Sequence, residues 1–161
     1  MMPARAHRLA DVRLVRENRQ MARYFAIDEA NARLADVQPL LEQLKADRDE
    51  VARLQPEIER GQKSNGSSEH AEQLAAMERE QRHAVRRMQD AVTQIDDWGI
   101  TLRDINTGLI DFPALANGRP IWLCWRLGEG DEVNWWHEAN AGFDSRQPLS
   151  ELDMGGAGGR A

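Results

Sequence analysis

The chain has 161 residues, of which 41% are apolar and 30% are charged, and its formal net charge is -6. This length allows one globular domain with a modest core, and no apolar stretch approaches the roughly 20 residues that cross a bilayer. The acidic balance argues against a general nucleic-acid binder, because such a protein needs a basic face. Cys124 is the single cysteine, so no disulfide framework is present, and we expect a cytoplasmic protein.

Residues 1–20 carry five arginines and no apolar segment of the kind found in signal peptides. We interpret them as a disordered or non-domain extension. Organised sequence begins at about Met21. Contact of this basic segment with an acidic partner or a nucleic acid is the alternative.

A long amphipathic helix is predicted from Asp28 to about Arg60, because apolar residues recur there at steps of three and four. Asp28 is the expected N-cap. Pro39 and Pro56 each lack an amide hydrogen, so each is expected to kink or divide the helix.

A second amphipathic helix is predicted from Glu69 to Trp98, after a polar turn over Gly61–Ser68, and Gly99 is its expected C-cap. Two such helices joined by a short loop pack antiparallel, so residues 28–98 predict a coiled-coil-like hairpin. The same apolar stripes can serve a symmetric dimer, and we expect a homo-oligomer or a protein partner.

After Gly99 the pattern changes to short runs rich in β-branched and aromatic residues, separated by glycine-containing turns. This predicts a three- to four-stranded antiparallel meander over residues 100–140. The expected fold class is α+β, with one domain over residues 21–150. Residues 151–161 are glycine-rich and are expected to be a disordered tail.

The dipeptide Asn117-Gly118 predicts a two-residue type I′ turn, which places Ala116 opposite Arg119. Asp111 then lies across from Cys124. Alternation assigns one face of the sheet to the core: Ile110, Phe112, Leu123, Trp125 and Leu127.

The next hairpin is aligned by pairing Leu127 with Val133, which places Cys124 opposite Trp136. The second face then gathers Asp111, Trp122, Cys124, Arg126, Trp136 and Glu138. His137 falls on the core side beside Leu123, although a one-residue bulge would exchange it with its neighbours. Indoles beside charged groups are typical of a ligand pocket or an interface, but a returning segment or a second copy can also cover this face.

Two stretches, "RYFAIDEANARLADVQPLLEQL" and "DINTGLIDFPALANGRPIWLCWRLGE…WWHEANAGFDSRQPL", resemble the bacterial family catalogued as domain of unknown function 2203. The resemblance covers Arg23 to Leu149 and supports the domain limits. It implies no activity or cofactor, because that family is functionally uncharacterised. Where the family usually has a capping threonine, this chain has Ala26.

The residues with metal-ligand chemistry near the second face are Asp104, Asp111, Cys124, Glu129, His137 and Glu138. Cys124, His137 and Glu138 are the leading candidates for metal ligands, although no pair shows a recognised metal spacing. A catalytic cysteine would need an adjacent base, and a mid-strand Cys124 is more typical of an inert thiol. Arg146 offers a planar guanidinium for an anionic ligand or for a salt bridge that fastens the C-terminal segment.

Two hypotheses follow. The first is a non-enzymatic protein that self-associates or binds a ligand through its helical hairpin and its tryptophan-lined sheet face. The second is a small metal- or ligand-dependent enzyme whose site includes Asp111, Cys124, Arg126, His137, Glu138 and Arg146. The sequence assigns no cofactor, no catalytic residue and no substrate.

Overall fold

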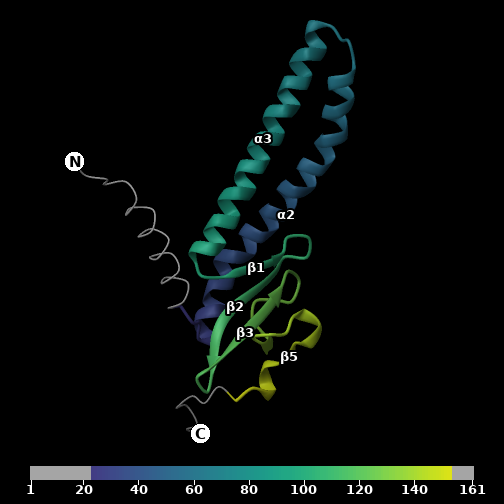
Figure 1. Ribbon diagram of the computed structural model, residues 1–161. Coiled ribbons are helices and arrows are strands. Elements are labelled where there is room, and N and C mark those ends of the chain that lie inside the picture. The colour runs from purple at the N-terminus through teal and green to yellow at the C-terminus, as the bar shows by residue number, and fades with distance from the viewer. Residues whose placement is uncertain (1–22, 154–161) are drawn as a thin grey trace, which may run out of the picture.

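The computed structural model describes residues 23–153, which form two long helices followed by an antiparallel sheet (Figure 1). The helices and strands are α2 (Ile27–Lys63), α3 (Ser68–Asp97), β1 (Thr101–Asp104), β2 (Leu109–Ala116), β3 (Arg119–Arg126), β4 (Trp135–Glu138) and β5 (Gln147–Pro148). Two short 3-10 helices flank β5, at Phe143–Ser145 and Leu149–Glu151. The predicted α+β class is confirmed. The disorder predicted for residues 1–20 lies outside the described residues. Of the predicted tail, residues 151–161, the structure describes 151–153, and Leu152 packs against the core.

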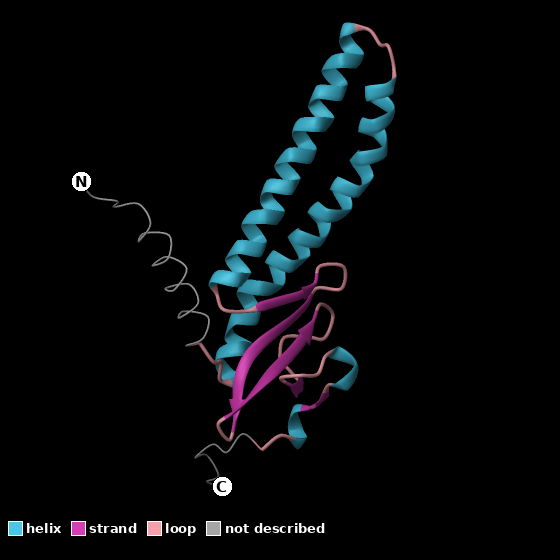
Figure 2. Cartoon of the chain, viewed as in Figure 1, coloured by secondary structure: helices cyan, strands magenta, loops and turns pink. Residues whose placement is uncertain are grey.

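α2 and α3 form an antiparallel hairpin that extends away from the sheet as an arm (Figures 1 and 2). α2 is continuous through Pro39 and Pro56, so the expectation that these prolines divide it is wrong. The helix begins at Ile27, and its cap position is Ala26, two residues before the predicted cap Asp28. The amide of Ala26 donates to Glu29 Oε1 at 3.2 Å, which replaces part of what a capping side chain would supply.

The turn between the helices is shorter than predicted, because α2 continues to Lys63. Gly61 therefore lies inside the helix, and the side chain of Leu74 packs directly on it. A Cβ at Gly61 would lie 2.9 Å from Leu74 Cδ1, so glycine allows the close approach of the two helices. Ser67 Oγ accepts from the amide of His70 and caps α3.

The sheet is a meander with strand order β1-β2-β3-β4-β5, one strand more than the predicted three to four. The pairing of β2 with β3 is confirmed: Ala116 lies opposite Arg119, and Asp111 lies opposite Cys124. Asn117 adopts the positive φ of 52° that a type I′ turn requires.

The predicted pairing of β3 with β4 is wrong by one residue. Cys124 lies opposite Trp135, and Leu123 lies opposite Trp136. The expected Leu127–Val133 pair is absent because other groups bind both amides: Leu127 donates to Gly108 O, and Val133 donates to Asn31 Oδ1 of α2 at 2.7 Å. A contact with the helix therefore sets where β4 starts.

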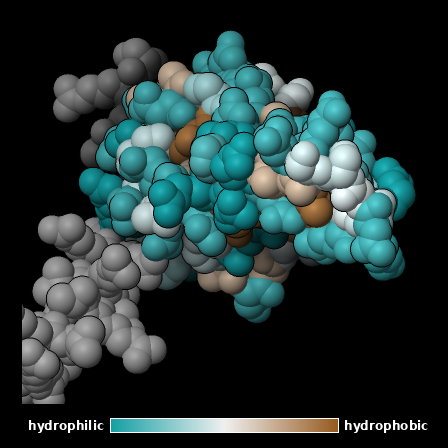
Figure 3. Space-filling view, turned by 90° about the horizontal axis from the view of Figure 1, so that it is seen from above, coloured by the Kyte–Doolittle hydropathy of each residue, from teal (hydrophilic) through white to brown (hydrophobic). Residues whose placement is uncertain are grey.

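One face of the sheet packs against the base of the hairpin and forms the core. Trp125, Phe112 and Leu123 are fully buried there, against apolar residues of α2 and the C-terminal turns of α3. The opposite face carries the candidate site. Seen from above, the exterior is mostly hydrophilic with small separate hydrophobic patches (Figure 3). None of the helices in residues 23–153 combines the length and apolarity needed to cross a membrane.

Candidate metal and ligand site

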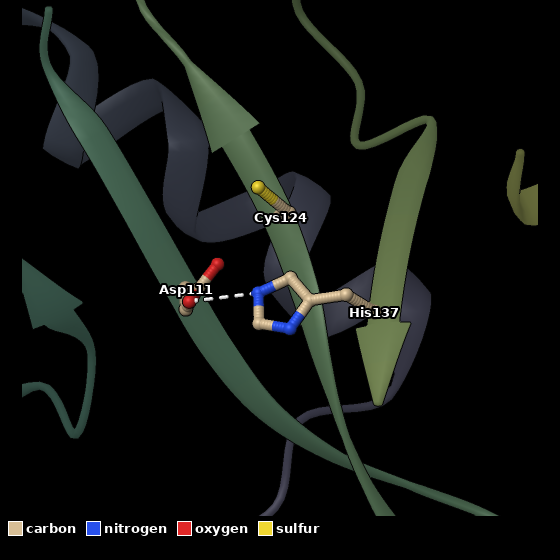
Figure 4. A group of neighbouring side chains, drawn as sticks. All are labelled: Asp111, Cys124 and His137. Atoms are coloured by element: carbon tan, nitrogen blue, oxygen red, sulfur yellow. Dashed lines mark hydrogen bonds and ion pairs between the residues drawn. The ribbon is translucent and has the colours of Figure 1, made fainter. Parts of the chain in front are cut away.

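Three adjacent strands bring Asp111, Cys124 and His137 together on the sheet face away from the helices (Figure 4). Asp111 of β2 lies directly opposite Cys124 of β3, and His137 of β4 is the diagonal neighbour of Cys124. A carboxylate oxygen, the thiol sulfur and a ring nitrogen all lie within 4.8 Å of one another, and all three residues are buried. We call these three residues the buried triad.

Asp111 is 2% exposed, yet only one of its carboxylate oxygens is satisfied. Oδ2 accepts from Arg103 Nε at 2.8 Å and lies 3.0 Å from His137 Nε2. Oδ1 is buried and has no hydrogen-bond partner within residues 23–153. Because a buried, unpaired carboxylate oxygen is costly, Oδ1 marks a position where a further donor or a cation is needed.

Both ring nitrogens of His137 face acceptors. Nδ1 lies 2.9 Å from the carbonyl oxygen of Glu138, and Nε2 lies 3.0 Å from Asp111 Oδ2. A neutral ring carries one hydrogen and can donate to only one of them. If Nδ1 donates to Glu138, the lone pair of Nε2 faces the Asp111 carboxylate, and a cation can bind both groups. A histidine whose outer nitrogen donates to a carbonyl is the arrangement typical of metal ligands.

Cys124 is completely buried, and burial raises the pKa of its thiol to about 12, with the nearby Asp111 charge adding to the effect. Arg146 lies close enough to the thiol to oppose this shift. The thiol is therefore protonated at neutral pH and is a poor nucleophile in this state. A bound metal ion would instead lower the pKa of the Cys124 thiol, because a coordinated thiol loses its proton.

A cavity of about 340 Å³ lies beside the buried triad. All three triad residues line it, together with Arg103 of β1 and the loop of residues 139–143 that follows β4. The loop contributes small residues, Ala139, Ala141 and Gly142, and the ring of Phe143. The cavity therefore lies next to the triad on one side, and the volume of the cavity is in the range of small-molecule sites.

Arginines and aromatic rings cover the other end of this face. Arg146 Nη2 forms an ion pair with Glu129 Oε1 at 2.6 Å, and its guanidinium lies 4.6 Å from the Trp135 ring centre and 4.2 Å from that of Phe143. Arg126 also approaches Glu129 and stacks on Phe143. Arg146 therefore fastens the segment after β4 onto the sheet through Glu129. Of the two roles expected for Arg146, this is the salt bridge and not the binding of an anionic ligand.

The one-residue shift of β4 redistributes the predicted site residues. His137, expected in the core, lies in the site, and Trp136, expected in the site, lies in the core. Glu138 pairs with Arg119 at 3.1 Å, so its carboxylate does not join Cys124 and His137. Trp122 stays at the edge of the face, where it stacks with Arg103 at 4.8 Å.

The other candidate carboxylates have local partners. Asp104 accepts from the amide of Asn106 and from the hydroxyl of Thr107, which closes the turn between β1 and β2. Glu129 is held by Arg146. Of the six residues with ligand chemistry, only Asp111, Cys124 and His137 converge among the described residues.

Sequence reasoning missed Arg103 and Trp135. Arg103 lies where the β1–β2 register shifts, between Leu102 and Asp104, so simple alternation along the strand does not assign it to a face. Trp135 was assigned to the core by the shifted register. No local signal reveals that shift, because it depends on the contact of Val133 with Asn31.

These features define an α+β protein in which a helical hairpin supports a small meander with a buried cluster of potential metal ligands. The chain belongs to the family described as Uncharacterized conserved protein (DUF2203), whose model matches residues 23–149. The resemblance found in the sequence is thereby confirmed. Neither the curated proteins nor the solved structures gave a significant match to the chain.

Proposed function

We propose that this protein binds a divalent transition-metal ion, with zinc as the first choice, through Asp111, Cys124 and His137. The observation that carries the proposal is the unpartnered, buried Oδ1 of Asp111 beside a thiol and an imidazole nitrogen. A cation at this point satisfies Oδ1, removes the thiol proton of Cys124 and occupies the lone pair of His137 Nε2.

The donor set selects among metals. Thiolate and imidazole ligands favour zinc and other borderline metals, whereas magnesium and calcium prefer an all-oxygen shell. On a tetrahedral zinc ion, neighbouring ligand atoms are about 3.3 to 3.7 Å apart, as follows from bond lengths of 2.0 to 2.3 Å. The triad atoms lie within 4.8 Å of one another, so a contraction of at most about 1.5 Å brings them to these distances.

Three protein ligands with one open side are characteristic of catalytic zinc sites, whereas structural sites use four. The cavity beside the triad supplies this open side. The site therefore supports the metal-dependent alternative over a purely structural centre. A thiolate ligand also suits a reducing compartment, so we place the protein in the cytoplasm.

The test is metal titration of chelator-treated protein with zinc, and with cobalt(II) as an optical substitute. We expect one ion per chain and an absorption band from a cobalt–thiolate bond. Asp111→Asn and Cys124→Ala each remove one ligand and are expected to lower metal affinity by on the order of 100-fold or more. His83→Ala, which changes an exposed histidine on α3, is the matched control and should bind like the wild type.

Circular dichroism establishes that each variant folds, and the nearly isosteric Asp111→Asn carries the test if Cys124→Ala does not. Less than about one tenth of an ion per chain at saturating zinc would contradict the proposal. Equal affinity in the wild type and a folded Asp111→Asn or Cys124→Ala protein would also contradict it.

A second function, self-association, is favoured by an apolar ridge on the hairpin. Val85 and Val92 of α3 are 37% and 39% exposed, and Met88 lies between them on the same side of the helix. Val51 of α2 extends the ridge. The spacing of residues 85, 88 and 92 is that of a coiled-coil seam, which fits the same ridge of a second copy.

A further inference from the structure

We infer that the open side of the metal centre takes a small organic monocarboxylate and that Arg103 is the residue that recognises it. This inference rests on the proposed metal centre and adds the class of ligand. Three features of the cavity support it: its charge, the free donors of Arg103, and the shape of the opposite wall.

The charges around the cavity favour an anionic ligand. Asp111 neutralises Arg103 through the 2.8 Å contact between Oδ2 and Nε. A divalent ion bound by Asp111 and the Cys124 thiolate would take up the charge of Asp111. Arg146 and Arg126 share the single carboxylate of Glu129, so neither leaves a spare negative charge for Arg103. The positive charge of Arg103 is then left without a counter-charge, which an anion can supply.

The donors of Arg103 match a planar anion. Its Nε donates to Asp111, and its two terminal nitrogens have no partner in the described part of the chain. Its guanidinium lies over the Trp122 ring at 4.8 Å, which restricts the plane in which the free donors lie. The side chain is 41% exposed and lines the cavity. A fixed, planar pair of N–H groups fits the two oxygens of a carboxylate.

The opposite wall limits the rest of the ligand. Ala139, Ala141 and Gly142 leave room beside the triad, and the Phe143 ring offers an apolar surface. A cavity of about 340 Å³ suits a molecule with a short carbon chain. We therefore assign one carboxylate group to Arg103 and the metal, and a short apolar group to the Phe143 side.

The experiment uses cobalt(II)-loaded protein with metal in excess, so that the metal site stays filled in every variant. Butyrate, acetate and inorganic phosphate are titrated separately, and the visible cobalt spectrum is the readout. We expect butyrate to bind at least as tightly as acetate, and phosphate at least tenfold more weakly than either. Arg103→Lys keeps the charge and loses the planar fork, so it should weaken butyrate binding at least tenfold. Arg119→Lys, outside the cavity, is the matched control.

The outcomes separate the two proposals. A cobalt spectrum that no carboxylate changes contradicts the ligand assignment and leaves the metal centre in place. Unchanged butyrate affinity in Arg103→Lys contradicts the role of Arg103, and phosphate binding equal to that of butyrate contradicts the carboxylate class. Failure to take up cobalt contradicts the metal centre and, with it, the inference that rests on it.

Discussion

At the scale of single residues, Cys124 shows how burial decides chemistry. Its thiol lies on the site side of the sheet and lines the cavity, yet the residue is fully buried. Burial raises its pKa to about 12, so in the metal-free protein it is a neutral group packed among polar neighbours. The sequence-based interpretation of Cys124 as an inert thiol stays a prediction, and the raised pKa is its physical basis.

This shift predicts how metal-free stability depends on pH. The folded state keeps the Cys124 proton up to about pH 12, whereas the unfolded thiol ionises near its ordinary value of 9.0. The folded state therefore binds more protons in this interval, and the free energy of unfolding falls as pH rises. In chelator-treated protein, the wild type should lose up to about 1.4 kcal/mol per pH unit more than Cys124→Ala above pH 9.

Urea unfolding of both proteins at several pH values between 8 and 11 measures this difference. The remaining titratable groups are common to the two proteins and cancel in the comparison. Parallel stability curves for the two proteins across this range would show that the thiol does not keep its proton on folding.

At the scale of elements, the hairpin contains a buried charged contact within its apolar seam. Asp47 of α2 is buried, and Arg87 of α3 donates to its Oδ1 from Nη2 at 2.7 Å and from Nε at 3.0 Å. Gln43 donates to the same oxygen. The apolar pattern of α2 has one seven-residue step, from Leu44 to Val51, and Asp47 lies within it. A single charged pair between two helices specifies their register.

Removing Arg87 should therefore destabilise the hairpin more than removing an ordinary surface arginine. Arg87→Met leaves the Asp47 carboxylate buried with only Gln43 as a partner, so we expect the free energy of unfolding to fall further below the wild-type value than it does in the control variant. The double variant Asp47→Leu/Arg87→Met should recover most of this loss. Arg86→Met changes the neighbouring exposed residue and serves as the control.

Equilibrium unfolding in urea gives all four values. Equal losses for Arg86→Met and Arg87→Met would mean that the buried pair contributes nothing specific. A double variant as unstable as Arg87→Met alone would point to lost packing and not to an unpaired charge.

The two hairpins of the sheet differ in whether their register could be predicted from the sequence. Asn117-Gly118 is a local signal that fixes the β2–β3 register, so the opposition of Asp111 and Cys124 was predictable. The loop before β4 has no such turn, and its end is fixed by the bond from Val133 to Asn31 across the fold. Side chains alternate with a period of two, so this single unpredicted contact exchanged Trp136 and His137.

The same reasoning separates the predictable part of the site from the rest. Asp111 and Cys124 were placed on one face correctly, and His137 was named as a candidate but assigned to the other face. Glu138 was expected to be a ligand because the shifted register placed its carboxylate beside Cys124. The helix hairpin and the α+β class were predictable from periodicity alone, because long amphipathic patterns need no tertiary information.

At the scale of the whole molecule, the apolar ridge of Val85, Met88 and Val92 predicts self-association. We expect the wild type to sediment as a dimer at micromolar concentration and Val85→Glu/Val92→Glu to sediment as a monomer, because two buried, unpaired carboxylates oppose the contact. Ala76→Glu lies on the opposite side of α3 and should leave the dimer intact. A monomeric mass for the wild type at every concentration tested would contradict this assignment.

The distribution of the indole rings also has a consequence for spectroscopy. Trp125 and Trp136 are enclosed in the core, whereas Trp122 and Trp135 lie on the site face beneath the guanidinium groups of Arg103 and Arg146. These four rings place fluorescence from two environments within one small sheet, and Trp98 at the end of α3, beside Arg33, adds a fifth emitter outside it. The enclosed rings emit as reporters of global unfolding, and the two outer rings report occupancy of the neighbouring cavity. The molecule thus carries its own optical probes for both events, without an added dye.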